Sequence, residues 1–438
     1  MFSAKYNIYL LFVILSAIYF IYKYHINKYS LLILIFFWQG IFQSFGGLFE
    51  NVFKIFVVLY SVMLLRPNFN KNKKITDYLV GLSFLAYSII FWFSYIYYRR
   101  GAIFTILSQY FYKLAIPVIL FYGLKDIEFD SIKRNYLSKM LLFAIYVQVI
   151  LSIIKVMIFG FDFEPIVGSM ASWGGGYAVV FPLVALLFYW VIKKGNLNKN
   201  EWLIIASFII IAVASGKRTP VFLYPLFLVA LQFTRRNTYI NIRTLFISIF
   251  IAVILFYFAV RLTVTLNPEG KVWGSFDIQY VTDYALTYNF GTDNPKDIAN
   301  EYYQSEGRGG ALTLIFNPQK LGLYSITEIL IGNGYSTEGL MSPKHGGWGI
   351  EHEGLIGSII GSLNRMGYLG TLFMVAFCVM IICRTKDIRY RCIFLALYLW
   401  DLLLYANLVF FDRPTAFLMI FTIYYVNSYH NNNIIVHR

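Results

Sequence analysis

The chain has 438 residues, of which 59% are hydrophobic and only 13% are charged. Soluble domains carry about 25% charged residues, so this composition excludes an ordinary soluble globular protein and fits a chain solvated mainly by lipid. The formal net charge of +15 does not indicate nucleic-acid binding, because most basic residues stand in short connectors between apolar runs.

Thirteen apolar runs follow one another along the chain, and each is a candidate membrane-spanning helix. In chain order they cover residues 6–22, 31–49, 52–65, 77–98, 102–124, 137–160, 176–192, 202–216, 219–234, 242–264, 355–383, 391–411 and 414–429. The first run has no small-residue cleavage site behind it, so we expect it to be retained. Because some runs are short for a span, the sequence predicts 12 or 13 transmembrane helices in an all-α polytopic membrane protein.

The distribution of basic residues predicts the orientation of the chain. Alternate connectors on one side hold 19 lysine and arginine residues, and the short connectors on the other side hold 5. The first set is therefore expected to be cytoplasmic, together with the C-terminus. The chain then divides into transmembrane helices in 1–264, a large periplasmic loop in 265–354 and C-terminal transmembrane helices in 355–438.

The large loop differs in composition from the rest of the chain. It holds 11 acidic and 5 basic residues, with Trp273, Phe276, Tyr280 and an apolar stretch at 311–316. Long loops without structure are uncommon unless they are functional or disordered, and the aromatic content argues against disorder. We therefore expect a folded, helical cap.

The most informative segment joins the end of this loop to the next apolar run. Gly332 and Gly334 precede His352, which stands where the chain re-enters the membrane. An imidazole there can remove a proton from a hydroxyl, because its ordinary pKa of about 6.5 lies near working pH. The neighbouring Glu351 and Glu353 can orient the ring. The alternative interpretation is an interfacial histidine in a polar turn.

A basic turn at 215–220 is expected on the outer side, against the general charge bias. Lys217 and Arg218 stand there ahead of Pro220. The guanidinium of Arg218 suits bidentate binding of a phosphate, and Pro220 is typical of the first helical position, so a helix N-terminus would face the anion. The alternative is a headgroup anchor.

Four further outer residues are candidates for substrate binding. Arg100 and Arg413 are basic, although Arg413 can simply pair with Asp412. Arg308 lies among glycines, which either let the backbone approach another group closely or form a flexible loop tip. Trp173 can stack on a sugar or act as an interface anchor.

Charged residues inside apolar runs form a separate group. Lys54, Lys113, Lys155 and Asp401 are costly at membrane depth, so we expect them to face protein or water.

The motifs that are absent limit the chemistry. The sequence has no Walker A motif, no G-x-S-x-G elbow, no H-E-x-x-H and no Asp-x-Asp pair, which argues against an ATP-driven pump, a serine hydrolase, a zincin and a metal-dependent nucleotide-sugar transferase. None of the three cysteines lies in the large loop, so neither a disulfide framework nor a cysteine metal site is predicted. We expect no metal and no cofactor.

At these positions the chain resembles the bacterial O-antigen polymerase and ligase superfamily, and within it the Wzy-type polymerases. The layout of spans with one large, late periplasmic loop is similar. Also similar are the basic turn around Arg218, the glycines Gly332 and Gly334, His352 at the re-entry, and the pattern Leu-x-x-x-Gly-x-x-Gly at 363–370. Glu353 departs from the ligases, which usually have asparagine there, and this favours a polymerase.

The resemblance implies a metal-independent glycosyl transfer at the periplasmic face of a bacterial inner membrane. The donor would be a polyprenyl-diphosphate-linked glycan chain, and the acceptor a hydroxyl of a polyprenyl-diphosphate-linked oligosaccharide. Arg218, assisted by the other outer basic residues, would bind the diphosphate, and His352 would act as the base. A chain-length regulator is a further possible partner. An O-antigen ligase acting on lipid A core, a lipid-linked oligosaccharide flippase and a scaffold protein stay open as alternatives.

Overall fold

The fold is all-helical in a computed structural model of the chain. The structure describes residues 4–45, 47–64, 75–98, 103, 106–107, 110–124, 131–160, 166–170, 177–214, 218–234, 242–290, 313–319, 321–334, 358–404, 416 and 418–427. These residues contain α-helices, short 3₁₀-helices and one π-helical segment, and they contain no strand. The predicted all-α class is therefore confirmed for this part of the chain.

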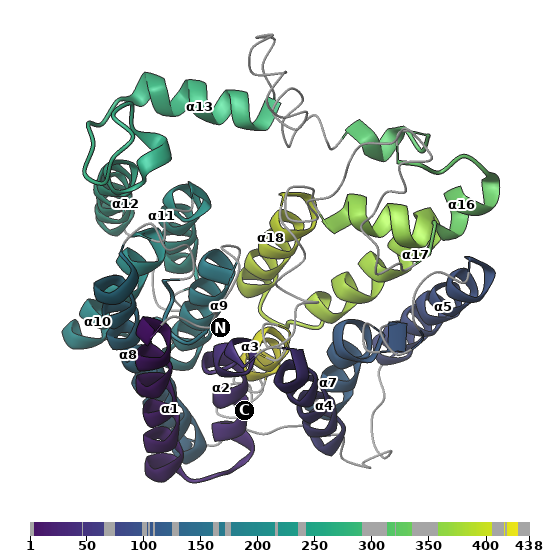
Figure 1. The fold of residues 1–438 in the computed structure, drawn as a ribbon, viewed down its shortest axis with the longest axis horizontal. Coiled ribbons are helices and arrows are strands. Elements are labelled where there is room, and N and C mark those ends of the chain that lie inside the picture. Colours follow the sequence, from purple (N-terminus) through teal and green to yellow (C-terminus); the bar gives the residue numbers. More distant parts are fainter. Residues whose placement is uncertain are drawn as a thin grey trace.

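The elements follow one another without any repeated unit standing out (Figure 1). They are α1 (Ala4–Tyr24), α2 (Lys28–Phe37), α3 (Gly40–Ser44), α4 (Gly47–Leu64), α5 (Ile75–Tyr98), η1 (Tyr110–Ala115), α7 (Ile116–Leu124), α8 (Ser131–Phe159), α9 (Tyr177–Lys193), α10 (Lys199–Ala214), α11 (Arg218–Gln232), α12 (Ile242–Leu262), η2 (Val264–Leu266), α13 (Ile278–Phe290), η3 (Thr313–Phe316), α16 (Ile326–Ile331), α17 (Ser358–Cys383) and α18 (Ile388–Leu404). A last helix covers Leu418–Asn427.

Four helices are long and apolar enough to cross a membrane by length and composition. They cover Lys5–Tyr24, Asp77–Tyr97, Ile132–Phe159 and Ile359–Cys383. Six shorter apolar helices accompany them within the described residues. This is consistent with an all-α membrane protein, whereas the number of 12 or 13 spans stays a prediction.

Several predicted runs differ from the helices observed. The run 31–49 is divided among α2, α3 and the start of α4, because α2 ends at Phe37 and the backbone turns at Trp38 and Gln39 before α3 begins. In α17 the run 355–383 is interrupted at Gly367. The straight part after Gly367 is only about 24 Å long at about 1.5 Å per residue, which is short of the roughly 30 Å hydrocarbon core.

Large apolar side chains cover the outside of several helices. Leu11 and Leu15 on α1, Leu82 on α5, and Phe246 and Phe250 on α12 are each more than half exposed. Soluble proteins rarely leave apolar patches of this extent in water. These helix faces are therefore suited to lipid.

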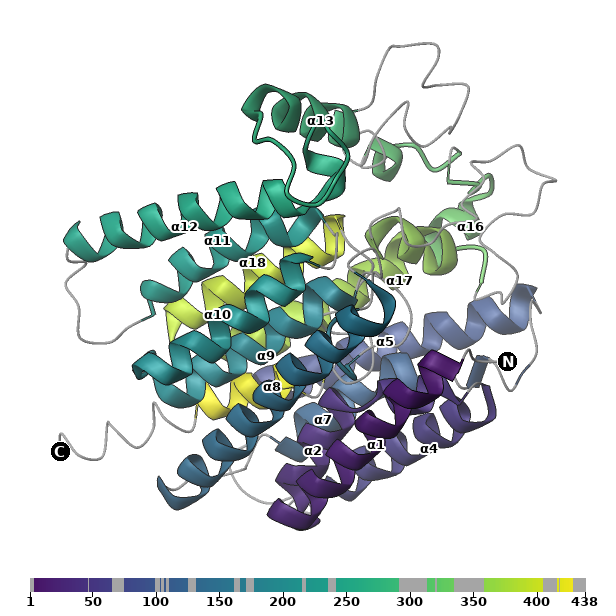
Figure 2. The ribbon, with the colours of Figure 1, turned by 60° about the vertical axis from the view of Figure 1, so that its left-hand side comes forward.

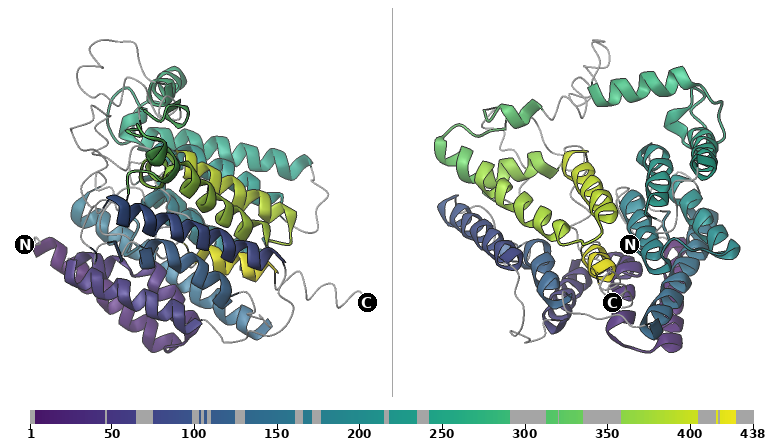
Figure 3. Two further views of the ribbon diagram at one scale, coloured as in Figure 1. Left: turned by 90° about the vertical axis from the view of Figure 1, so that its right-hand side faces the viewer. Right: turned by 180° about the vertical axis from the view of Figure 1, so that it is seen from behind.

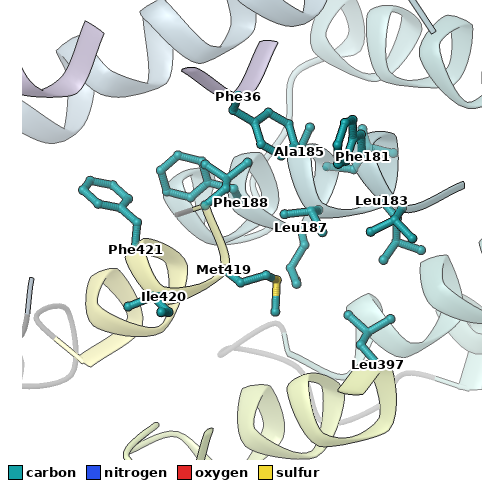
Figure 4. Packing of buried hydrophobic residues seen from close by; sticks show 14 of the residues in the cluster. Phe36, Phe181, Leu183, Ala185, Leu187, Phe188, Leu397, Met419, Ile420 and Phe421 are labelled. Atoms are coloured by element: carbon teal, nitrogen blue, oxygen red, sulfur yellow. The ribbon is translucent and has the colours of Figure 1, made fainter. Parts of the chain in front are cut away.

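Helix α9 lies at the centre of the bundle. Every residue from Val179 to Ile192 is buried, as expected of a helix that is apolar all round. Figure 4 shows α2, α9, α18 and the last helix contributing to one core. The rings of Phe36 and Phe181 are 5.3 Å apart, and those of Phe188 and Phe421 are 5.2 Å apart.

The loop helices gather at one end of the bundle. The long helices lie roughly side by side, and α13 and α16 stand at the same end, where α1 begins (Figures 2 and 3). Within 265–354 the described residues include the helices α13 and α16, whereas a folded cap stays a prediction. The side of the membrane on which this end lies stays a prediction.

The turn between α9 and α10 is fixed by a buried carboxylate. Glu201 pairs with Lys193 at 2.7 Å and accepts the N–H of Asn198 at 2.9 Å, while Asn198 caps the helix by accepting the N–H of Glu201. Burial alone would raise the pKa of Glu201, but the hydrogen bonds from Lys193 and the Asn198 backbone outweigh burial and hold the pKa below its ordinary value.

The Glu201→Gln variant is expected to be less stable than the wild type at neutral pH by about 1 kcal/mol. Because the folded pKa is depressed, this stability is fully present above the ordinary glutamate pKa of about 4.3 and is lost as pH falls through the folded pKa. Thermal unfolding in detergent between pH 7 and pH 3 tests this. The two midpoints should converge at low pH, and a gap that persists there would assign the loss to packing instead of charge.

Candidate functional site

The predicted site residues lie mostly outside the described part of the chain. Outside it are His352, Glu351, Glu353, Lys217, Arg308, Arg413, Arg100 and Trp173. Arg218 is described and is the first residue of α11. Two other segments singled out by the sequence, around Gly332 and around Gly367, are described as well, and they define the site's framework.

The start of α11 lies at the loop end of the bundle. Pro220 and Val221 line a narrow apolar recess of about 30 Å³ together with Leu262, the last residue of α12. The chain enters η2 and α13 directly after α12. The sequence predicted that Pro220 is the first residue of its helix. Helix α11 instead begins at Arg218, so Pro220 is the third helical residue. Proline is still tolerated there, since the first-turn N–H groups have no helical partner.

The two glycine-containing motif segments, 330–334 and 362–370, contact each other directly. The N–H of Asn333 donates to the carbonyl of Asn364 at 2.8 Å, and the N–H of Gly334 donates to that of Arg365 at 3.0 Å. The Asn364 side chain donates to the carbonyl of Leu321 at 2.6 Å. The backbone of the loop's last part is thereby bonded to the backbone of α17.

Glycine is required at two positions of this contact. Gly332 has φ +75° and Gly367 has φ +62°, a region that residues with a Cβ atom rarely adopt. A Cβ on Gly332 would lie 2.3 Å from the carbonyl carbon of Arg365, and one on Gly367 would lie 2.4 Å from that of Leu330. Gly332 therefore permits the close approach of the backbone at Arg365, and Gly367 permits that of the backbone at Leu330.

The first part of α17 folds back on the second part at Gly367. The Ser362 hydroxyl lies 3.0 Å from that of Thr371 and 3.5 Å from the Met374 sulfur, contacts that a straight helix does not allow across nine and twelve residues. Figure 1 shows the two arms of α17 meeting at this bend.

A small apolar core seals the contact. Leu321, Leu323, Ile360 and Leu363 are buried together. The Tyr368 hydroxyl donates to the carbonyl of Ile315 at 2.5 Å, which joins η3 to the same unit. We call the unit formed by 321–334 and the first arm of α17 the docking module.

The docking module fixes both flanks of the segment 335–357. Gly334 is bonded to Arg365, and Ser358 stands seven residues before Arg365 in the same helix, a rise of about 10 Å. The two described residues that flank this segment, Gly334 and Ser358, therefore belong to one unit. Glycine spacing had marked this region, but neither the fold-back nor the roles of Asn333 and Asn364 were predicted.

No group of three or more histidine, cysteine or acidic residues that could hold a metal occurs among the described residues. The described residues define a class: an all-helical protein with membrane-length apolar helices, short helices at one end of the bundle, and a kinked helix, α17, that contacts the segment 321–334. The chain matches no protein-family model, no curated protein and no solved structure.

Proposed function

We propose that the protein is a polysaccharide polymerase that transfers a polyprenyl-diphosphate-linked glycan chain onto a lipid-linked oligosaccharide repeat unit. The observation that supports this is the docking module. It brings the Gly332 motif and the Gly367 motif, more than thirty residues apart in the chain, into one backbone contact. The segment bearing His352 is attached between them.

The proposed reaction needs a base and an anion site on the same side of the membrane. An imidazole nitrogen of His352 removes the proton of the acceptor hydroxyl, and the hydroxyl oxygen forms a bond to the anomeric carbon of the donor sugar. The bond from that carbon to the phosphate oxygen breaks, and the lipid diphosphate leaves. Arg218 stabilises the charge of the leaving group, aided by the N-terminus of α11.

The apolar recess beside the start of α11 supports this arrangement. A lipid diphosphate has an anionic head and an apolar tail, and Arg218 begins a helix whose next residues line an apolar surface. Glu351 and Glu353 orient the imidazole in this proposal, and Trp173, Lys217, Arg308, Arg413 and Arg100 contribute contacts to sugar or phosphate. The reaction would take place at the periplasmic face of a bacterial inner membrane.

Replacing Arg218 or His352 with alanine is expected to lower polymer yield by about 10²-fold or more. The measurement is the glycan ladder of the native host, with the gene deleted and then restored as wild type or variant. Arg389→Ala is the matched control, because Arg389 is exposed in the first turn of α18 and should leave the ladder unchanged. The amount of protein in the membrane is measured in each strain.

The glycans that accumulate after deletion separate the alternatives. Single repeat units on lipid support the polymerase. Full-length polymer on the lipid carrier would indicate a ligase, and an unchanged ladder would contradict both. Normal ladders in both alanine variants would refute the site, even if deletion had removed the polymer.

A further inference from the structure

A second polar cluster is buried between α1, α2, α3, α8 and the turn 166–170, apart from the docking module. Lys155 of α8 is its charged member and is 1% exposed. The ammonium donates to the carbonyl of Gly168 at 2.8 Å and lies 5.0 Å from the centre of the Tyr9 ring. An ammonium inside a membrane helix bundle is costly unless polar groups surround it.

Three polar residues of α8 share the face that meets the turn. Gln148, Ser152 and Lys155 are separated by four and three residues, which places them on one side of the helix. Gln148 Oε1 accepts the Ser169 N–H at 2.7 Å and the Ser169 hydroxyl at 3.1 Å. Ser169 also bonds to the carbonyl of Phe37 at 2.9 Å, so the turn is held between α8 and α2.

The turn approaches α8 closely because of a glycine. Gly168 has φ +59°, and a Cβ there would lie 2.3 Å from Gln148 Oε1 and 2.9 Å from the Gln148 carbonyl oxygen. Lys155 binds the carbonyl of Gly168, and Gln148 binds the N–H of the next residue, Ser169. This brings the ammonium and the Gln148 carboxamide to the same place.

Several buried polar atoms around this place have no hydrogen-bond partner among the described residues. They are Nε2 of Gln148, Oγ of Ser152, the hydroxyl of Tyr9, and both Nε2 and Oε1 of Gln39. Gln39 is 1% exposed and stands between Phe37 and Gly40, which both bond to Ser169. Each unpaired buried group costs about 1–3 kcal/mol, so their number indicates a polar occupant.

We propose that this cluster binds a phosphate group. The ammonium of Lys155 supplies charge, the Gln148 and Gln39 amides and the Ser152 and Tyr9 hydroxyls supply hydrogen-bond donors, and Gln39 Oε1 accepts the proton of a hydrogen phosphate. Donors gathered round an ammonium select an oxyanion and reject a cation.

The depth of Lys155 fits a phosphate at the membrane surface. The apolar stretch of α8 has 28 residues and is therefore about 42 Å long, longer than the hydrocarbon core of about 30 Å. Lys155 stands four residues before Phe159, about 6 Å from the end of α8. A lipid headgroup and free phosphate offer the same chemistry at this level, and neither requires the proposed polymerase activity.

Thermal unfolding of the full-length protein, delipidated in a maltoside detergent, tests the site. Inorganic phosphate is added in one arm, with chloride of equal ionic strength as its control. Phosphatidylglycerol is added in the other arm, with a phosphate-free glycolipid as its control. We expect a saturable rise of about 3 °C or more in the unfolding midpoint. The arm that responds identifies the source of the phosphate.

Two variants and a matched control locate the effect. Lys155→Met and Gln148→Glu should both lose the response. The carboxylate of Gln148→Glu keeps the acceptor for Ser169 but replaces the amide donor with a negative charge that pairs with Lys155 and repels phosphate, so this variant stays informative if Lys155→Met fails to fold. Lys139→Met changes an exposed lysine of the same helix and should respond like the wild type. No response of the wild type in either arm, or a full response of Gln148→Glu, would overturn the proposal.

Discussion

Replacing Gly367 with alanine is expected to release the segment 321–334 from α17 and to abolish polymer formation. The added Cβ would lie 2.4 Å from the Leu330 carbonyl and 2.5 Å from the Gly332 nitrogen, and these backbone atoms cannot rotate away. The left-handed φ costs roughly 1–2 kcal/mol more, and overpacking about 1–3 kcal/mol. Amide hydrogen exchange of peptides within 321–334 should therefore accelerate about 10²-fold.

Gly361 provides the matched control for Gly367. It lies in the first arm of the same helix, and a Cβ there would meet no atom within 4 Å. Gly361→Ala should leave exchange in 321–334 unchanged, since alanine favours a helix over glycine by about 1 kcal/mol. Unchanged exchange in Gly367→Ala would show that the docking module does not depend on this approach. Released peptides with a normal ladder would instead uphold the module and contradict its place in the proposed reaction.

Much of the helical framework could be predicted from hydropathy alone. The run 6–22 corresponds to α1, and the run 242–264 to α12, Ile242–Leu262. In lipid every backbone polar group must be satisfied within the element, so a long apolar run has few alternatives to a helix. The prediction succeeds where a helix depends only on its own residues.

The positions at which helices end or bend inside an apolar run could not be predicted, because they depend on contacts between distant segments. Helix α2 ends at Phe37, and the N–H of Gly40, the first residue of α3, donates to the carbonyl of Ser169 far along the chain. The predicted run 355–383 continues across Gly367, yet the helix is broken there and its two arms contact each other. Gly367 within the motif indicates a bend, but the sequence does not indicate which distant backbone segment packs against that bend.

Of the candidate site residues, Arg218 lies in the described part of the chain, where it begins α11, and its role stays a proposal. The predicted base at His352 lies outside the described residues, and its role stays a proposal. Lys155 was expected to face protein or water, and it faces protein. The unpaired groups around it come from α8 itself, from α1 and from the turn between α2 and α3, so no local sequence pattern marks the cluster.

A buried ion pair joins the end of α17 to the start of α5. Arg384, after α17, pairs with Asp77 in the first turn of α5 at 2.5 Å, and both side chains are largely buried. The Tyr122 hydroxyl donates to the Asp77 carbonyl at 2.6 Å, and Asn427 donates to the Arg384 carbonyl at 2.9 Å. Four helical segments therefore meet at this ion pair.

Asp77→Asn is expected to lower the free energy of unfolding by about 3 kcal/mol, because it leaves the Arg384 guanidinium uncompensated in a poorly hydrated place. Thermal unfolding in detergent measures the loss. Glu269→Gln is the matched control: Glu269 also pairs with a cation, Lys271, at 2.5 Å, but both side chains are exposed, and exposed pairs contribute little. This variant should unfold at the wild-type midpoint.

A double-mutant cycle separates the ion pair from simple packing. Arg384→Met alone should also destabilise, since it leaves the Asp77 carboxylate buried without its cation. The double variant should be more stable than the sum of the two losses predicts, by about 1–3 kcal/mol, because it removes both charges together. Strict additivity would mean that the two side chains act independently. The contact at 2.5 Å would then be a consequence of how α5 and α17 pack and not a cause of it.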